Sequence, residues 1–296
     1  MIGDHMSRGR AAVLGVAGLS LAFASSVAGA TPRHVATSPS PAQATFVLTL
    51  TAKSTKGLPS TVTPGYHQFV IKTKASRGLQ IVRLLGSYKA KTADNDIQAG
   101  FQVNGPNDPH LKQWQRFTKN AQILGGLLPQ KGYFVTGSSF WVHLVPGNYV
   151  AANTPAGNGS DVLTPFTVTG TATGSKPKAT GLITPHEYGF GVVVQKGTHM
   201  VAIKDTGSQI HMVQIEKIDA GHTEADVITA LENAGPAAPP SWIHDAGFAG
   251  LISSKQIEYT PMHFTAGNYE VLCFMPDVHK GVPHIVLGMH RFFTVR

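Results

Sequence analysis

Short runs that alternate between apolar and polar residues dominate the chain from residue 45 onward. Such alternation is typical of β-strands that bury one face. Gly (32) and Pro (19) are frequent and charged residues make up only 14%, which suits short strands joined by turns. The sequence therefore predicts an all-β chain, with its clearest strands at 46–52, 67–73, 79–85 and 140–153.

Three segments carry a helical pattern instead of an alternating one. In the second half of the chain, Thr223 is a suitable N-cap for a helix over 224–234, where Val227, Ile228 and Leu231 form an apolar stripe. In the first half, the segments 92–101 and 110–120 are helical candidates. The pattern thus predicts a short helical insertion in each half.

The two halves of the chain repeat one another in sequence. PGYHQFVIK (64–72) aligns with KGTHMVAIK (196–204), VPGNYVAAN (145–153) with TAGNYEVLC (265–273), and TPFTV (164–168) with RFFTV (291–295). The repeating unit is longer than the roughly 20–50 residues of a solenoid repeat. We therefore expect two copies of a whole domain, at 45–169 and 179–296, joined by a small, polar, proline-containing linker at 170–178.

The N-terminal segment has the features of a secretory signal peptide. Arg8 and Arg10 precede an apolar run over 11–27, and Ala28-Gly-Ala30 follows as a cleavage site. The run is shorter than the roughly 20 strongly apolar residues that span a membrane. We expect removal of residues 1–30, a disordered leader at 31–44, and a secreted or periplasmic mature chain with no membrane span.

The net charge of +8 is spread along the chain. Lysines and arginines occur singly, without a basic run and without interleaved aromatic residues. This distribution argues against a nucleic-acid site.

The single cysteine of the chain lies in its most informative stretch, GNYEVLCFMPDVHKGVPHIVLGM (267–289). Tyr269, Val271 and Cys273 alternate with Asn268, Glu270 and Leu272, so we expect Cys273 to face inward with the apolar Tyr269 and Val271, at the end of a strand. A thiolate, imidazoles and a thioether form a soft donor set that favours copper. After the loop, the run over 285–295 predicts a final strand.

The segment GNYEVLC (267–273), followed by His284 and then Met289, resembles the C-terminal signature of the cupredoxins, the plastocyanin-like family. The resemblance implies two tandem Greek-key β-sandwiches in an exported, bacterial-type protein. It further implies a copper ion held by Cys273, His284 and Met289. Family loops usually place only a few residues between Cys and His, whereas ten separate Cys273 from His284 here.

The fourth ligand of the family is an upstream histidine, which His211 supplies after the turn Asp205-Thr-Gly207. His279 is a reserve ligand, nearer to Cys273 but with a different offset from Met289. The remaining histidines of the second half are interpreted as surface or structural residues: His186, His199, His222, His244, His263 and His290.

The first copy serves as an internal control for the donor set. In the local alignments Asn153 takes the place of Cys273, Leu79 falls opposite His211, and Asp161 and Val162 stand where the thioether would be. We therefore expect a degenerate first domain that lacks the ligand set.

Two classes of function remain open at this point. One is an exported copper protein of type-1-like character that transfers single electrons to a redox partner protein or handles copper. The alternative is a metal-free β-sandwich binding module at the cell surface. The sequence contains no His-x-His pair, no HExxH motif and no G-x-S-x-G motif, which favours an electron-transfer or binding protein over a catalyst. It leaves the oligomeric state open.

Overall fold

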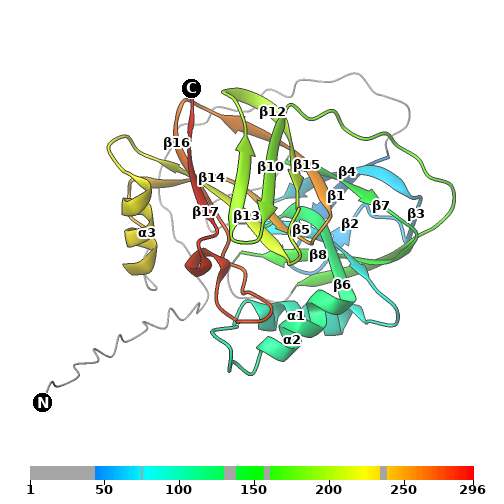
Figure 1. Cartoon of the computed structure of the whole chain (residues 1–296). Coiled ribbons are helices and arrows are strands. Elements are labelled where there is room, and N and C mark those ends of the chain that lie inside the picture. The colour runs from blue at the N-terminus through cyan, green and yellow to red at the C-terminus, as the bar shows by residue number, and fades with distance from the viewer. Residues whose placement is uncertain (1–43, 75, 130–137, 157–160, 234–238) are drawn as a thin grey trace, which may run out of the picture.

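The computed structural model describes residues 44–74, 76–129, 138–156, 161–233 and 239–296 (Figure 1). Strands dominate these segments and form three sheets, which confirms the expected all-β class. The expected signal peptide at 1–30 and nearly all of the expected leader lie outside the described residues, so both stay predictions.

The strands of the first half form two facing layers. One layer has the order β2-β1-β4-β7 and the other the order β3-β9-β8-β5-β6. Phe69 and Phe140 from one layer and Ile81 and Tyr149 from the other belong to one buried cluster. The strands are β1 (Thr45–Leu50), β2 (Thr55–Lys56), β3 (Thr61–Val62), β4 (Gly65–Thr73), β5 (Arg77–Leu84), β6 (Ala121–Leu127), β7 (Ser139–Leu144), β8 (Gly147–Pro155) and β9 (Val162–Val168).

The second half repeats this connectivity. Its layers are β11-β10-β12-β15 and β14-β13-β16-β17. β10 runs parallel to β12 as β1 does to β4, and β13 lies between β14 and β16 as β5 does between β6 and β8. The strands are β10 (Gly181–His186), β11 (Gly189–Val193), β12 (Gly197–Lys204), β13 (His211–Ile218), β14 (Ile243–Ile252), β15 (Ile257–Phe264), β16 (Gly267–Leu272) and β17 (His290–Val295).

The three sequence repeats fall on equivalent strands, namely β4 and β12, β8 and β16, and β9 and β17. Between β9 and β10 the chain forms no helix or strand. The domain boundaries and the linker at 170–178 stay predictions.

One continuous sheet runs through both halves of the chain. β7 pairs antiparallel with β15, with Trp141 opposite Tyr259, so the two four-stranded layers merge into a sheet of eight strands. A second contact joins the halves where the backbone N–H of Ile123 donates to Ser253 Oγ at 2.8 Å. Pairing the edge strands β7 and β15 satisfies backbone groups that each half would otherwise leave exposed.

The helical insertions occupy equivalent places in the two halves. α1 (Ala90–Gly100) and α2 (Leu111–Asn120) lie between β5 and β6, and α3 (Glu224–Asn233) lies between β13 and β14 (Figure 1). Thr223 caps α3 as expected, because its Oγ1 accepts the N–H of Asp226 at 3.3 Å. No helix in the described part of the chain is both long and apolar enough to cross a membrane.

Two strand predictions were wrong in their bounds. The expected strand over 140–153 is divided into β7 and β8, because Pro146 lacks an N–H and Gly147 adopts a φ of 151°. The final run does not begin as a strand, because η1 (His284–Leu287) is a 3₁₀ helix that ends at Gly288, with a φ of 94°.

Candidate metal centre

The four predicted ligands come from the ends of three strands and from η1. His211 opens β13, Cys273 directly follows β16, Met289 directly precedes β17, and His284 opens η1. All four side chains are fully buried. The β16–β17 ladder continues past its last pair, since the N–H of Cys273 donates to the carbonyl of Met289 at 3.3 Å.

The structure brings Cys273 and His284 into direct contact. Cys273 Sγ lies 3.4 Å from His284 Nδ1 and accepts the backbone N–H of Met212 at 3.3 Å. The rings of His211 and His284 are 5.1 Å apart, centroid to centroid. Met289 is fixed next to them through its backbone N–H, which donates to the carbonyl of His284 at 2.9 Å.

His211 is oriented by a buried carboxylate. Its Nδ1 lies 2.9 Å from Asp205 Oδ2, and neither side chain is exposed. Its other ring nitrogen, Nε2, is buried and has no hydrogen-bond partner among the described residues. Metal-ligating histidines commonly bind a carboxylate through one nitrogen and the ion through the other. An orphaned Nε2 backed by Asp205 therefore fits a metal ligand.

Burial sets the protonation of the cluster without metal. It raises the pKa of the Cys273 thiol to about 12. Burial, with nearby His211, lowers the pKa of His284 to about 4. The imidazole of His284 is therefore neutral at pH 7 and keeps a lone pair on one ring nitrogen, whereas the thiol must release its proton when a metal binds.

The cluster is looser than another donor group of the described chain. That group is Glu224, Glu270 and His290, whose ligand atoms all lie within 4.8 Å of one another. His211, Cys273 and His284 do not meet this limit in the part of the chain that is described. A copper ion at this site would have to draw the three donors together.

Asp277 organises the long loop between Cys273 and His284. Its carboxylate accepts the Tyr188 hydroxyl at 2.7 Å, the Gln209 amide at 2.8 Å and the N–H of Lys280 at 2.6 Å. Burial opposes the charged form, but these bonds together hold the pKa of Asp277 below its usual range. A charged Asp277 therefore closes the loop.

Gln209 connects this loop to the candidate ligand His284. Besides its bond to Asp277, its Oε1 accepts the N–H of Val278 at 2.7 Å and lies 3.4 Å from His284 Nε2. Both ring nitrogens of His284 therefore have a polar neighbour, Cys273 at Nδ1 and Gln209 at Nε2.

The helical insertion of the first half clamps the same loop from the outside. Trp114 is fully buried on α2 and stacks on Phe117, and its Nε1 donates to the carbonyl of Pro276 at 2.9 Å. Two further bonds join the same regions, from Gln115 Nε2 to the carbonyl of Val278 (2.8 Å) and from the N–H of Gly105 to the carbonyl of Gly281 (2.7 Å). The extra loop length is thus used for contact with the first half.

The structure places the reserve ligand His279 away from the buried donors. His279 is exposed, and its backbone N–H donates to Asp277 Oδ1 at 2.9 Å. Its side chain lines a surface groove beside α2.

Strand pairing corrects the expected counterpart of His211 in the first half. β5 pairs Arg83 with Tyr149, and β13 pairs Lys217 with Tyr269. Counting back along each strand places Arg77, not Leu79, at the position of His211. The offset between equivalent residues is 132 at β4 and β12 but 134 at β5 and β13, so the constant offset that aligned His211 with Leu79 does not hold.

Arg77 and Asn153 fill the place that His211 and Cys273 occupy in the second half. Arg77 Nε donates to Asn153 Oδ1 at 2.5 Å, and its terminal nitrogen donates to the Asn153 carbonyl at 2.8 Å. Val162 stands opposite Asn153, where Met289 stands in the second half. A buried guanidinium repels a cation, so this position of the first half offers neither the donors nor the charge for a metal.

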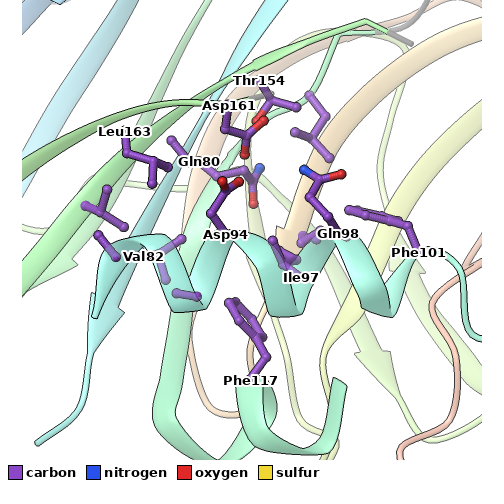
Figure 2. A pocket seen from close by; sticks show the side chains of 16 residues that line it. Gln80, Val82, Asp94, Ile97, Gln98, Phe101, Phe117, Thr154, Asp161 and Leu163 are labelled. Carbon is purple, nitrogen blue, oxygen red and sulfur yellow. The ribbon is translucent and has the colours of Figure 1, made fainter. Parts of the chain in front are cut away.

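A small cavity of ≈ 30 Å³ lies under α1 in the first half (Figure 2). Asp94, Asp161 and the amide of Gln80 point toward one another there. Neither amide atom of Gln80 has a hydrogen-bond partner among the described residues. Burial, with nearby Asp94, raises the pKa of Asp161 to about 6.

Three residues that support the candidate metal centre are not evident from the sequence pattern. Asp205 was noticed only as part of a turn, although a carboxylate six residues before a candidate ligand is a local signal. Gln209 gave no signal beyond its closeness to His211. Trp114 lies so far from the loop in sequence that only the folded chain could reveal its role.

Comparisons with known proteins give low similarity. No protein-family model matches the sequence, and no curated protein matches it. Among solved structures, dithionite-reduced auracyanin from the photosynthetic bacterium Roseiflexus castenholzii is 22% identical and has a TM-score of 0.26, covering 39% of this chain and 94% of its own.

Two further structures illustrate the range of the matches. Auracyanin A, a "blue" copper protein from Chloroflexus aurantiacus, is 22% identical with a TM-score of 0.23, covering 39% of this chain and 100% of its own. Copper nitrite reductase from Nitrosomonas europaea is 10% identical with a TM-score of 0.22, covering 86% and 94%. Because these TM-scores are low, we base the fold on the strand pairing and the site on its contacts.

Proposed function

We propose that this chain is an exported cupredoxin-like protein in which His211, Cys273 and His284 would hold one copper ion, with the Met289 thioether as a weaker ligand. The supporting observation is the orphaned Nε2 of His211, which is backed by Asp205 and lies beside the contact between Cys273 and His284. The function that follows is single-electron transfer with a redox partner protein, or copper handling.

Copper held by two imidazoles, one thiolate and a long thioether exchanges single electrons. The residues of this chain prepare the site for it. Asp205 holds the proton of His211 on Nδ1, so that the lone pair of Nε2 stays available. The N–H of Met212 donates to Cys273 Sγ, which stabilises a thiolate there. Full burial of the ligands excludes water.

We infer that the first half of the chain acts as a support for the site. Its own equivalent position holds Arg77 and Asn153 instead of donors, while Trp114 on α2 holds the loop between Cys273 and His284. This division of labour gives a reason for retaining a copy without ligands.

The test is a Cu(II) titration of the chain from residue 31, followed by visible absorption. We expect an intense sulfur-to-copper charge-transfer band, which Cys273→Ser should abolish. Met289→Leu should keep the band, because His211, Cys273 and His284 carry most of the copper affinity. It should also raise the reduction potential, because a weak ligand is removed.

The histidine assignment is tested by a matched pair of variants. We expect His284→Ala to remove the band and His279→Ala, at the exposed position, to leave it intact. The reverse result would move the ligand to His279. Absence of both a band and tight copper binding in the wild-type chain would refute the copper site and return the chain to the class of metal-free binding modules.

A further inference from the structure

A second group of donors lies on the other face of the sheet that carries Cys273. Glu270 on β16 and His290 on β17 point away from the Cys273 side, toward α3, whose first residue is Glu224. His290 Nδ1 lies 3.1 Å from Glu224 Oε1 and 3.1 Å from Glu270 Oε1. The ligand atoms of the three residues all lie within 4.8 Å of one another.

A salt bridge alone does not satisfy this group. Nδ1 of His290 carries at most one hydrogen, yet two carboxylates approach it at the same distance. Glu270 is fully buried, and its second oxygen has no partner among the described residues. Glu216 lies opposite Glu270 in the sheet, is also buried, and has an unpartnered oxygen too.

Apart from the contact of Glu270 with His290, no cation of the described chain pairs with these two buried carboxyl groups. Neither Glu216 nor Glu270 forms an ion pair with a lysine or arginine within the described ranges. Buried carboxylates without a partner are costly, so they are normally paired or bind a metal.

The first half shows that the fold does not need these polar groups. By strand pairing, Val82, Val150 and Leu163 occupy the places of Glu216, Glu270 and His290. All three line the cavity under α1, where Figure 2 labels Val82 and Leu163. Two carboxylates and an imidazole in the second half thus replace three apolar side chains.

We propose that Glu224, Glu270 and His290 form a second metal site, for a divalent cation of the zinc class. Imidazole and carboxylate ligands suit such an ion, unlike the soft set around Cys273. Tetrahedral coordination with bonds of about 2.0–2.2 Å separates ligand atoms by roughly 3.3–3.6 Å. The two observed separations of 3.1 Å are slightly shorter, so a bound ion needs only a small outward shift of the side chains.

The site is accessible and has room for a further ligand. The side chain of Glu224 is 48% exposed and that of His290 21% exposed, so an ion can enter from solvent. Three protein ligands leave a fourth position for water or another donor. An ion bound here joins α3 to β16 and β17. Its ligand His290 directly follows Met289 in the sequence.

The experiment is a calorimetric titration with Zn²⁺ alone, on the chain from residue 31 carrying Cys273→Ser to remove the soft site. We expect one equivalent of Zn²⁺ to bind and to raise the unfolding temperature. Adding Glu224→Gln or His290→Gln should weaken Zn²⁺ binding at least tenfold. Even groups that only orient a ligand contribute roughly 10–100-fold to metal affinity, and these residues are the ligands themselves. Glu224 is half exposed, so its variant should fold normally.

Asp219→Asn is the matched control. It removes a carboxylate from an exposed pair with His244, at 3.0 Å, and no second carboxylate pairs with His244 within the described ranges. We expect it to leave Zn²⁺ binding unchanged. Failure of the Cys273→Ser chain to bind Zn²⁺, or equal binding by the Glu224 and His290 variants, would overturn the inference and leave only a salt bridge. Neither outcome bears on the visible copper band, which requires Cys273.

Discussion

Asp205→Asn tests how the chain prepares His211, because it keeps the shape of the side chain and changes only its hydrogen-bonding character. Asp205 Oδ1 accepts the N–H of Gly207 at 2.8 Å, and an amide oxygen can keep that bond. Asp205 Oδ2, which is 2.9 Å from His211 Nδ1, becomes an NH₂ group that can only donate. His211 must then accept at Nδ1 and carry its proton on Nε2, so Nε2 loses the lone pair that a metal needs.

The magnitude follows from this change of tautomer. Loss of a partner that orients a ligating histidine typically costs about 10–100-fold in metal affinity. This corresponds to roughly 1.4–2.8 kcal/mol of binding free energy. Without metal, the variant should be as stable as the wild-type chain or more stable. Burial raises the pKa of Asp205, although His211 lowers it, so the folded chain disfavours the buried charge. A neutral amide removes that cost.

The assay has two readouts that a merely structural role would not separate. Copper affinity is measured by competition with a chelator, and unfolding of the metal-free chain by urea. We expect weaker copper binding together with unchanged or higher metal-free stability, while Asp219→Asn, which alters an exposed carboxylate–histidine pair, changes neither. Copper affinity within twofold of wild type would refute the role of Asp205, and a parallel loss of stability would point to simple structural damage.

Two further predictions concern the first half of the chain. Trp114→Phe leaves the buried carbonyl of Pro276 without its donor, so we expect the free energy of unfolding in urea to fall by about 1–3 kcal/mol and copper binding to weaken. Trp141→Phe is the control, because Trp141 Nε1 has no hydrogen-bond partner in the described structure. Equal losses of stability in both variants would contradict the proposed contact between α2 and the loop. The pKa of Asp161 is raised to about 6, so its contribution to stability is highest in acid and is lost as pH rises through 6. Asp161→Asn should therefore stabilise the folded chain at pH 7.5 by at most about 3 kcal/mol, seen as a higher thermal midpoint, and should have little effect near pH 4. A lower thermal midpoint of the variant at pH 7.5 would refute this.

Much of the fold was readable because its signals are local. Alternation in segments such as 67–73 and the Thr223 cap reflect interactions between near neighbours, and the structure has a strand and a helix there. The joining of the halves through β7 and β15 was not readable, because edge pairing depends on which strands meet in space. The 3₁₀ turn at η1 was missed because the apolar run from residue 285 masks the effect of Gly288.

The site shows the same division between local and distant information. Burial of Cys273 and its closeness to His284 follow from one short stretch and its alternation, and both are present in the structure. The clamp by Trp114 depends on contact between residues more than a hundred positions apart. His290 was interpreted as structural because the two glutamates near it come from other elements, and only folding brings the three together.

X-ray absorption spectroscopy of the copper-loaded chain measures most directly whether His211, Cys273 and His284 hold the metal together. We expect a first coordination shell with one short copper–sulfur bond and two imidazole nitrogens, and loss of the sulfur in Cys273→Ser. Loading at one equivalent limits occupation of the group around His290. A shell made only of nitrogen and oxygen in the wild-type chain would contradict the central claim, because Cys273 would then remain a buried thiol beside a metal bound elsewhere.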